Sequence, residues 1–475
     1  MENVIIGAGP AGLSAGYNLA KHGIKPLILE KDSLISGLAK TLQFEYDGYT
    51  YLTDTGPHRF FSQNPNLYRM MEDMLGEDWH VVDRLTRQYI DGKYYDYPVN
   101  MVQALMNVGP VKALLIMLDY LVATARKILV NPEKNTFEDW VYSNFGKRLA
   151  DLNMTNYTEK IWGIPCSQIS GAWAAQRIKG MNAFDIVKKA LIKSGGPRSM
   201  VSYFCYPTKG IQQIYDTMAD FVVNNGGQLK KEIIVNKINH DGKKVTSVDF
   251  TENGKQNQVK TSNLISSMAI TDLVQTMNPS PSTDVIKAAR TLRYRDQVQV
   301  FLIIDKPHIT KDTWIYFPTT PPTFGRMMEP KNWIASMAPK NRSSLLVEYF
   351  VFKGDEIWSM PDEKIIEKTM RELEWLGFTK KDDLLKGFVH RNEKSYPLWN
   401  LTYKKHLDKI FNFVNSFDNL YCVGRNGRFY YNNQDHSIET GLLAAQSIIE
   451  GKKYDLSKIG MEDTYFEAGM LYQKK

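Results

Sequence analysis

The sequence is poor in cysteine and has no metal-ligand spacing. Its 475 residues include only three cysteines, Cys166, Cys205 and Cys422. Their odd number and wide spacing predict neither a disulfide framework nor a metal site. Free thiols are typical of a reducing compartment, so we expect a cytoplasmic protein. A Ser-His-Asp or Cys-His pattern is also missing, which makes a bound cofactor the expected source of the chemistry.

The chain also lacks a long apolar run. Its longest apolar stretch, residues 113–125, contains Asp119 and is too short to cross a bilayer. This stretch predicts a buried helix and no integral membrane segment, with contact to a membrane surface as the alternative. The sequence opens Met1-Glu2-Asn3 without basic residues, which is unlike a secretory signal peptide.

A concentrated charge is missing as well. The net charge of +7 comes without a block rich in lysine and arginine. Such mild basicity suits a small anionic ligand, and it does not support binding to nucleic acid.

The N-terminal segment contains the strongest pattern in the sequence. A short apolar strand leads into Gly7, Gly9 and Gly12, which have the spacing G-x-G-x-x-G, and a helix follows. The three glycines permit a tight turn, a close approach to a pyrophosphate and close packing of helix on strand. A second strand ends at Glu30, about 20 residues on, where an acid can bind a ribose diol. Together these features predict a dinucleotide cofactor.

A second polar segment lies near the C-terminus. A strand over residues 419–423 ends at Gly424 and is followed by a loop rich in Arg, Tyr and Asn. Asp435, His436 and Ser437 then precede a predicted helix over residues 438–450. Backbone N–H groups at such a helix start suit a phosphate or an electron-rich ring. Ordinary capping by Asp435 or Ser437 is the alternative.

Further candidates are isolated residues with two interpretations each. His58 follows Gly56 and Pro57, so it is either part of a ligand-binding loop or a hydrogen-bonded loop histidine. Trp162 either floors a pocket or belongs to the core. Arg177 and Arg326 either clamp a phosphate or lie on the surface.

Three segments resemble the flavoprotein superfamily of amine oxidases and protoporphyrinogen oxidases: G-A-G-P-A-G, G-P-H-R-F-F-S and V-G-R. Within this superfamily the sequence is most similar to UDP-galactopyranose mutases. The stretch from Thr136 to Arg177 and the segment 431–437 resemble the eukaryotic-type mutases. The motif Y-T-E-K-x-W-G is also similar to the bacterial ones.

The resemblance implies an α/β fold with an FAD-binding, Rossmann-like domain of the amine-oxidase type. We expect this domain to be discontinuous, over residues 1–100, 201–285 and 420–475. A helical insertion over residues 101–200 and a substrate domain with an antiparallel sheet over residues 286–419 would interrupt it.

The resemblance also implies the residues of the site. Catalysis would depend on His58, Arg177 and Arg326, without a metal. FAD would be bound by Gly7, Gly9, Pro10, Ala11, Gly12, Glu30, Lys31, Gly37, Leu38, Ala39, Gly56, His58, Val235, Gly424, Arg425, Asp435, His436 and Ser437. The substrate would be bound by Tyr97, Trp162, Arg177, Tyr203, Phe204, Tyr316, Arg326, Tyr396, Tyr431 and Asn433.

The implied activity is the interconversion of the pyranose and furanose forms of a nucleotide sugar such as UDP-galactopyranose. In such mutases reduced FAD, with NADPH or NADH as a candidate reductant, forms an N5–sugar adduct and displaces the nucleotide diphosphate. An FAD-dependent oxidase or dehydrogenase of the amine oxidase or protoporphyrinogen oxidase type is the alternative. A non-catalytic binding protein similar to the Rab GDP-dissociation inhibitors is a third, and the intact glycine turn with Glu30 argues against it.

Overall fold

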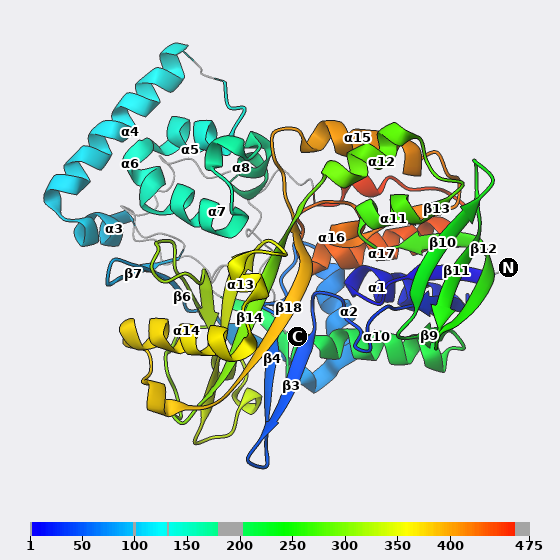
Figure 1. The fold of residues 1–475 in the computed structure, drawn as a ribbon, viewed down its shortest axis with the longest axis horizontal. Helices are drawn as coiled ribbons and strands as arrows, with labels where there is room; N and C mark the ends of the chain where they lie inside the picture. Colours follow the sequence, from blue (N-terminus) through cyan, green and yellow to red (C-terminus); the bar gives the residue numbers. More distant parts are fainter. Residues whose placement is uncertain (1, 98–100, 131–132, 179–202, 461–475) are drawn as a thin grey trace.

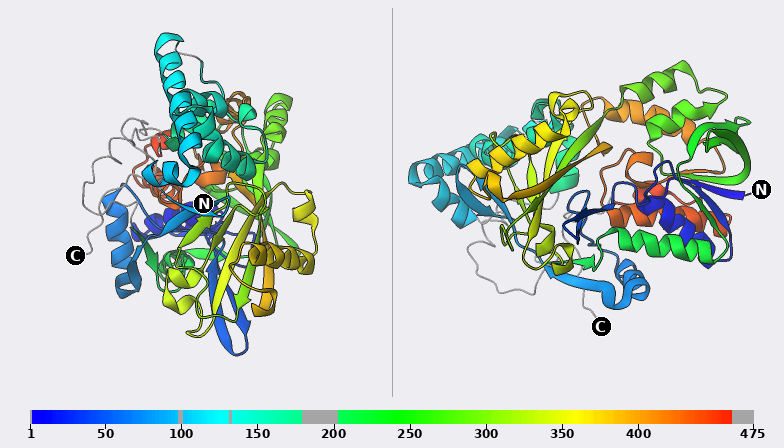
Figure 2. Two further views of the ribbon diagram at one scale, coloured as in Figure 1. Left: turned by 90° about the vertical axis from the view of Figure 1, so that its left-hand side faces the viewer. Right: turned by 60° about the horizontal axis from the view of Figure 1, so that its bottom comes forward.

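The computed structural model describes residues 2–97, 101–130, 133–178 and 203–460. Two large β-sheets and a group of helices, α3 to α8, are the main parts of the described chain (Figure 1, Figure 2). The first sheet lies on the right of Figure 1, the second at the lower left, and the helices α3 to α8 above the second sheet. The predicted α/β fold is confirmed.

The first sheet has eight strands within the described chain. Strands β1 and β2 pair in parallel, as do β1 and β12, and β12 and β19. The sheet is built from β13 (Met277–Asn278), β10 (Ile234–His240), β11 (Val245–Glu252), β12 (Lys255–Ser266), β1 (Glu2–Ile6), β2 (Pro26–Leu29), β9 (Gln228–Lys230) and β19 (Leu420–Cys422).

Two helices from opposite ends of the chain pack against each other beside this sheet. Helix α1 (Pro10–Lys21) follows the glycine turn, and α17 (Gln434–Ile449) lies against it. A Cβ on Gly441 would lie 2.0 Å from the carbonyl oxygen of Ala11, so the two helices approach too closely for a side chain there. The Ser14 hydroxyl donates a hydrogen bond of 3.0 Å to the carbonyl of Ile438.

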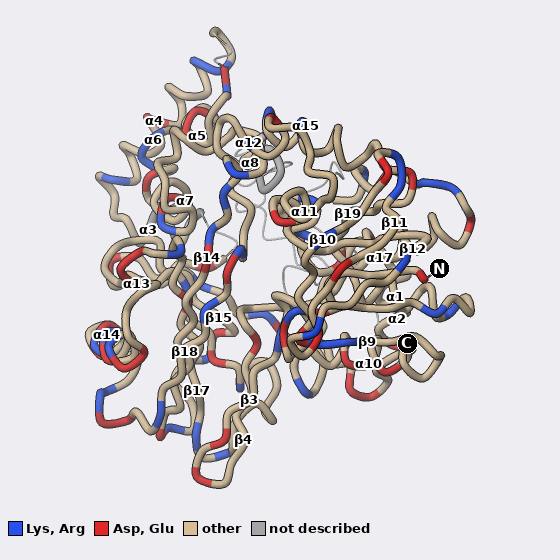
Figure 3. Tube along the Cα trace, turned by 45° about the vertical axis from the view of Figure 1, so that its right-hand side comes forward, with Lys and Arg blue, Asp and Glu red and all other residues tan. Residues whose placement is uncertain are grey.

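The second sheet has seven strands within the described chain. In order they are β18 (Leu384–Pro397), β14 (Tyr294–Ile304), β17 (Ser343–Val351), β16 (Arg326–Met328), β15 (Trp314–Tyr316), β6 (Thr86–Ile90) and β7 (Lys93–Asp96). One face packs its apolar side chains on α14 (Asp362–Trp375), whose outer surface carries both charges (Figure 3). The other face is turned toward the first sheet.

Smaller elements complete the two sheet regions. They are the hairpin β3 (Thr41–Tyr46) and β4 (Tyr49–Asp54), the pair β5 (Trp79–Asp83) and β8 (Tyr203–Pro207), and the helices α2 (Pro65–Leu75), α10 (Gln212–Asn224), α11 (Ile270–Thr276), α12 (Thr283–Thr291), α13 (Glu356–Ser359), α15 (Tyr403–Val414) and α16 (Gly424–Gly427). Strands β6 and β7, within the predicted segment 1–100, join the second sheet. Helix α15, within 286–419, packs on α12 beside the first sheet. The domain boundaries stay predictions.

The helical group contains α3 (Met101–Val108), α4 (Pro110–Val130), α5 (Phe137–Phe145), α6 (Lys147–Leu149), α7 (Thr155–Trp162) and α8 (Gly171–Ile178). The prediction that residues 113–125 form a buried helix is wrong in one respect. The helix is present, but among its described side chains only Ile116 is buried. Helix α4 covers α5 and α6 with one face and leaves the other exposed. None of the described helices combines the length and apolarity that crossing a membrane needs.

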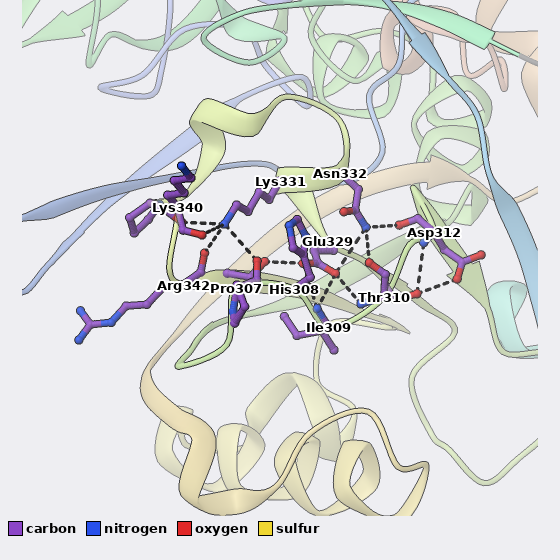
Figure 4. A network of polar contacts seen from close by, with 12 residues as sticks. Pro307, His308, Ile309, Thr310, Asp312, Glu329, Lys331, Asn332, Lys340 and Arg342 are labelled. Atoms are coloured by element: carbon purple, nitrogen blue, oxygen red, sulfur yellow. Dashed lines mark hydrogen bonds and ion pairs between the residues drawn. The ribbon is translucent and has the colours of Figure 1, made fainter.

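Two buried charges hold together the loops around β16 (Figure 4). The Glu329 carboxylate accepts hydrogen bonds from the backbone N–H groups of Ile309 and Thr310. The Lys331 ammonium donates to the carbonyls of four residues, Pro307, Pro339, Lys340 and Arg342, at 2.7 to 3.0 Å. These charge-assisted bonds fix the backbone on both sides of the strand that carries Arg326.

We expect Lys331→Met to lower the free energy of unfolding by about 2–4 kcal/mol, because buried carbonyls would lose a charged donor. Lys340→Met is the matched control, since the Lys340 side chain is exposed and only its carbonyl takes part. Urea denaturation measures both. Equal stability of the two variants would contradict a structural role for the Lys331 ammonium.

Candidate functional site

The glycine turn forms a surface without side chains at the start of α1. Gly7 has a φ of 93°, and a Cβ on Gly12 would lie 1.9 Å from the Gly7 carbonyl oxygen. A Cβ on Gly9 would lie 3.5 Å from the Cα of Gly37, which comes from a separate loop. Pro10 and Ala11 then begin the helix. Exposed backbone at a helix N-terminus suits an anionic group.

Glu30 lies beside this turn at the end of β2. It is only 5% exposed, and its carboxylate accepts hydrogen bonds from the backbone N–H of Ala8 at 2.6 Å and of Asp32 at 2.9 Å. The Glu30 carbonyl accepts from Ile233, two residues before Val235 on β10. Lys31 points to solvent. The acid is therefore positioned where the motif predicts it.

Three segments meet at His58. Its Nε2 donates to the Thr55 carbonyl at 3.0 Å, and the Thr55 hydroxyl donates to the carbonyl of Leu38, next to Ala39. Gln434, in the first turn of α17, donates to the carbonyls of His58 and Arg59 at 3.1 and 2.9 Å. The loop that contains Gly56 is thus tied both to the loop of Gly37 and to the helix start.

The start of α17 presents an unsatisfied polar group. Asn433 is its N-cap residue, and the buried Nδ2 of Asn433 has no hydrogen-bond partner within the described chain. Asp435 and Ser437 are buried on the first turn, and His436 is partly buried beside them. A buried donor is costly unless it meets an acceptor, so Asn433 indicates a ligand at this helix end.

The electrostatic surroundings keep the His58 imidazole neutral. Burial, together with the positive charges of Arg425 and Arg326, lowers the pKa of His58 to about 3. The lone proton is on Nε2, because the carbonyl of Thr55 can only accept. His58 is therefore placed to orient its loop and cannot act as a cationic acid near neutral pH.

A row of polar side chains crosses the second sheet and faces His58. The strand register aligns Tyr316, Arg326, Glu348, Gln299 and His390 on neighbouring strands, and we term these five residues the polar row. The Gln299 amide donates to the Thr55 carbonyl at 2.7 Å. A Cβ on Gly56 would lie 3.0 Å from Glu348 Oε1. The polar row thus contacts the loop of Thr55 and Gly56 directly.

Arg326 and Glu348 form a buried ion pair within the polar row. The Glu348 side chain is fully buried and that of Arg326 is 13% exposed. Arg326 Nη2 donates to Oε1 at 2.9 Å while its Nε binds Oε2, and Gln297 donates to Oε1 at 3.1 Å. Because Glu348 fixes one edge of the guanidinium, the opposite edge is held in a single direction.

Aromatic rings from three parts of the chain surround this pair. Tyr316 lies 5.2 Å from Tyr157 and 5.4 Å from Tyr97, measured between ring centroids. Tyr396 stacks on Tyr431 at 5.5 Å. We term these five tyrosines, together with Trp162 and Arg425, the aromatic cluster.

Trp162 and Arg425 both lie beside the stacked rings of Tyr396 and Tyr431. The Trp162 ring lies 6.1 Å from that of Tyr396 and is 2% exposed. The Arg425 guanidinium lies 5.1 Å from the ring centroid of Tyr396, and it donates to the carbonyls of Asn432 and Ser395. The cluster therefore combines flat apolar faces, hydroxyl groups and positive charge.

Lys160 connects the helical group to the polar row. From α7 its ammonium donates to the carbonyls of Phe317, Thr319 and Pro322 at 2.7 to 2.8 Å. These residues belong to the loop between β15 and β16, which separates Tyr316 from Arg326. Helix α7 thereby sets the position of both.

Two of the expected substrate residues lie elsewhere. The Phe204 ring is fully buried, 4.7 Å from the ring of Trp333, so it belongs to the core and has no face for a base. Tyr203 is 5% exposed on the same strand. The Arg177 side chain, at the end of α8, lies outside the described residues.

Sequence reasoning missed Glu348, Gln297 and Gln299, and it gave Tyr157 no role. A signal was present for the first, because Glu348 is a charge in the middle of the apolar segment 345–350. A charged residue in a buried strand needs an oppositely charged or hydrogen-bonding partner, and it is therefore a candidate for a functional site.

Comparison with known proteins identifies the family and the fold. Residues 10–449 match the family of flavin containing amine oxidoreductases, so the chain belongs to this family. The fold is similar to that of reduced UDP-galactopyranose mutase, with a TM-score of 0.82 and 21% identity, covering 98% of this chain and 99% of that one. It is also similar to putrescine oxidase, with a TM-score of 0.61 and 14% identity, covering 94% and 99%.

Curated sequences match over short stretches. All-trans-zeta-carotene desaturase of Myxococcus xanthus is 44% identical over 54 residues, 11% of this chain and 10% of that protein. The chain matches between 10% and 12% of the length of the first such relatives. The resemblance seen in the sequence is confirmed at the level of the family and the fold.

The residues present fit the flavin of this family. The open backbone at Gly9 and Gly37 suits the pyrophosphate, and Glu30 suits a ribose. The N-cap of α17, with Asn433, suits the electron-rich part of the ring system. The individual contacts to FAD stay predictions.

Substitution of two glycines separates cofactor binding from folding. Alanine at position 9 fits the protein alone, because its Cβ would be in ordinary contact and the φ of −85° is allowed. We expect Gly9→Ala to fold normally and to lose FAD, and Gly12→Ala to lose both FAD and thermal stability of the apoprotein. Flavin absorbance and thermal unfolding measure the two effects. Full FAD content in Gly9→Ala would contradict the predicted approach of the pyrophosphate.

The pKa of His58 can be measured by histidine side-chain NMR. Because burial and the two arginines lower this pKa, the imidazole should stay neutral down to about pH 4. Arg425→Met removes one positive neighbour, so the pKa should rise while staying below the ordinary 6.5. Titration of wild-type His58 near the ordinary histidine pKa of 6.5 would contradict this prediction.

Proposed function

We propose that the protein is an FAD-dependent pyranose–furanose mutase that acts on a nucleotide sugar of the UDP-galactopyranose type. The observation that carries the proposal is the Arg326–Glu348 pair, directed at the His58 loop within the aromatic cluster. When bound, FAD in its reduced form would supply an electron-rich centre for exchange at the sugar, with NADPH or NADH as the reductant.

Arg326 is the residue best placed to bind the diphosphate. Glu348 occupies its Nε edge, so the other N–H groups remain for an anion. Charge develops on the diphosphate as the sugar leaves it, and a fixed guanidinium stabilises that charge without reorganising. Arg177 is the proposed second clamp, from the helical group.

The aromatic cluster would hold the sugar and exclude water. Flat rings such as that of Tyr157 pack against the apolar face of a hexose, and tyrosine hydroxyls pair with its hydroxyls. The buried Trp162 would support the rings of Tyr396 and Tyr431 from the core. Neutral His58 would keep its loop close to the flavin without competing for the diphosphate. The nucleotide base stays unassigned because Phe204 is buried.

Amine oxidation is the second candidate function. The similarity to putrescine oxidase favours it, and aromatic rings also suit an amine cation. Two observations weigh against a cation here. The Arg425 guanidinium donates to backbone carbonyls, which are neutral and so do not offset a positive charge. The local positive charge also helps to lower the pKa of His58.

Titration with UDP, followed by flavin or tryptophan fluorescence, tests the proposal. Arg326→Ala alone would leave Glu348 buried and unpaired, so the informative variant is Arg326→Ala/Glu348→Ala, which removes both charges. We expect UDP affinity to fall about 10- to 100-fold in this variant, with FAD retained. Arg342→Ala is the control, because Arg342 pairs with exposed Asp47 and Asp305 far along the sheet.

Wild-type protein that does not respond to UDP or other nucleoside diphosphates would overturn the nucleotide-sugar assignment. The oxidase alternative would then take its place.

A further inference from the structure

Helix α4 exposes an apolar face along its whole length. Leu114, Leu118, Leu121 and Leu129 are 59%, 50%, 60% and 82% exposed. Their spacing puts them on one side of the helix, opposite the buried Ile116. The helix forms the outer edge of the molecule in Figure 1 and is mostly free of charge in Figure 3. An exposed apolar face of this extent marks an interaction surface.

The charges of α4 are arranged around this face. Its one acid, Asp119, is turned toward α6, where it accepts from the Arg148 backbone at 2.8 Å and pairs with the Arg148 guanidinium at 3.0 Å. Lys112 and Arg126 are exposed, and their spacing of seven residues from Asp119 puts them on the same side of the helix as that acid, at the border of the leucine face. The exposed residues of α4 therefore include leucines on one side and two basic residues at the border of that side.

The wider charge distribution has the same sign. Residues 101–178 of the helical group contain 8 basic and 6 acidic residues, a net charge of +2. This excess equals that of α4 alone, which carries Lys112, Arg126 and Lys127 against Asp119. An anionic lipid surface complements both features. A second copy of the chain would complement only the leucines, because it would bring two helices of the same net positive charge together.

We propose that α4 lies in the surface of an anionic membrane, with its leucine face in the acyl boundary and its basic residues among the headgroups. The helix would bind parallel to the surface and would not cross the bilayer, in agreement with its four charged residues, Lys112, Asp119, Arg126 and Lys127. The rest of the helical group, which carries Trp162 and Lys160, would then lie directly above the membrane.

Vesicle flotation of the FAD-loaded full-length protein tests this proposal. Vesicles are made of phosphatidylcholine alone or of phosphatidylcholine with phosphatidylglycerol. We expect the wild type to float with the anionic vesicles, and to do so less at high salt. Leu114→Gln/Leu118→Gln/Leu121→Gln should weaken binding about 100-fold, since three leucines lose their burial in lipid.

A matched control uses three apolar side chains of similar exposure on other elements. Ile234, Trp375 and Leu401 are 62%, 63% and 53% exposed, and the variant Ile234→Gln/Trp375→Gln/Leu401→Gln should float like the wild type. Flavin absorbance confirms that both triple variants are folded. Light scattering gives the mass of each protein in solution.

Two results would overturn the proposal. They are failure of the wild type to float with anionic vesicles, and equal flotation of the α4 variant and the wild type. Equal flotation together with a change in the mass in solution would assign the face to contact between copies.

Discussion

Glu348 is a carboxylate without exposed surface, and the candidate site depends on how its charge is balanced. Burial of an unpaired carboxylate costs several kcal/mol, so Arg326 must stay in place while Glu348 is ionised. Gln297 adds a hydrogen bond to the same carboxylate. The ion pair thereby holds a guanidinium in a fixed direction at the centre of the aromatic cluster.

The position of this pair matters because of what lies opposite. Gln299, in the same row, binds the Thr55 carbonyl, and His58 binds that carbonyl as well. One backbone oxygen thus joins the second sheet to the loop beside the glycine turn. Gln434 holds the same loop from the start of α17. A displacement of the second sheet would therefore also move the loop of Thr55 and His58. A displacement of this loop would likewise move the second sheet.

The parts of this site differ in how far the sequence predicts them. The glycine turn and Glu30 were predictable because the local backbone itself requires the glycines. Gly7 has a positive φ, and a side chain on Gly12 would collide with the carbonyl oxygen of Gly7. Arg326 and Tyr316 were predicted as site residues only from the family resemblance. Glu348 and Gln299 were not predicted, because only the register of three strands brings them together.

The helix over residues 110–130 shows a second limit of prediction from sequence. Its apolar composition correctly predicted a helix, but the prediction that this helix is buried was wrong. Composition states how apolar a helix is, but not how much of its surface the rest of the chain covers. Here α5 and α6 cover one side only, and the leucines of the other side are left exposed.

The most direct measurement of the central claim is product formation by the dithionite-reduced holoprotein. It is incubated with UDP-galactopyranose and a panel of other nucleotide-hexoses, and chromatography separates pyranose from furanose. We expect a nucleotide-furanose product with reduced flavin and none with oxidised flavin. No furanose from any of these sugars, together with oxygen consumption on addition of an amine, would contradict it.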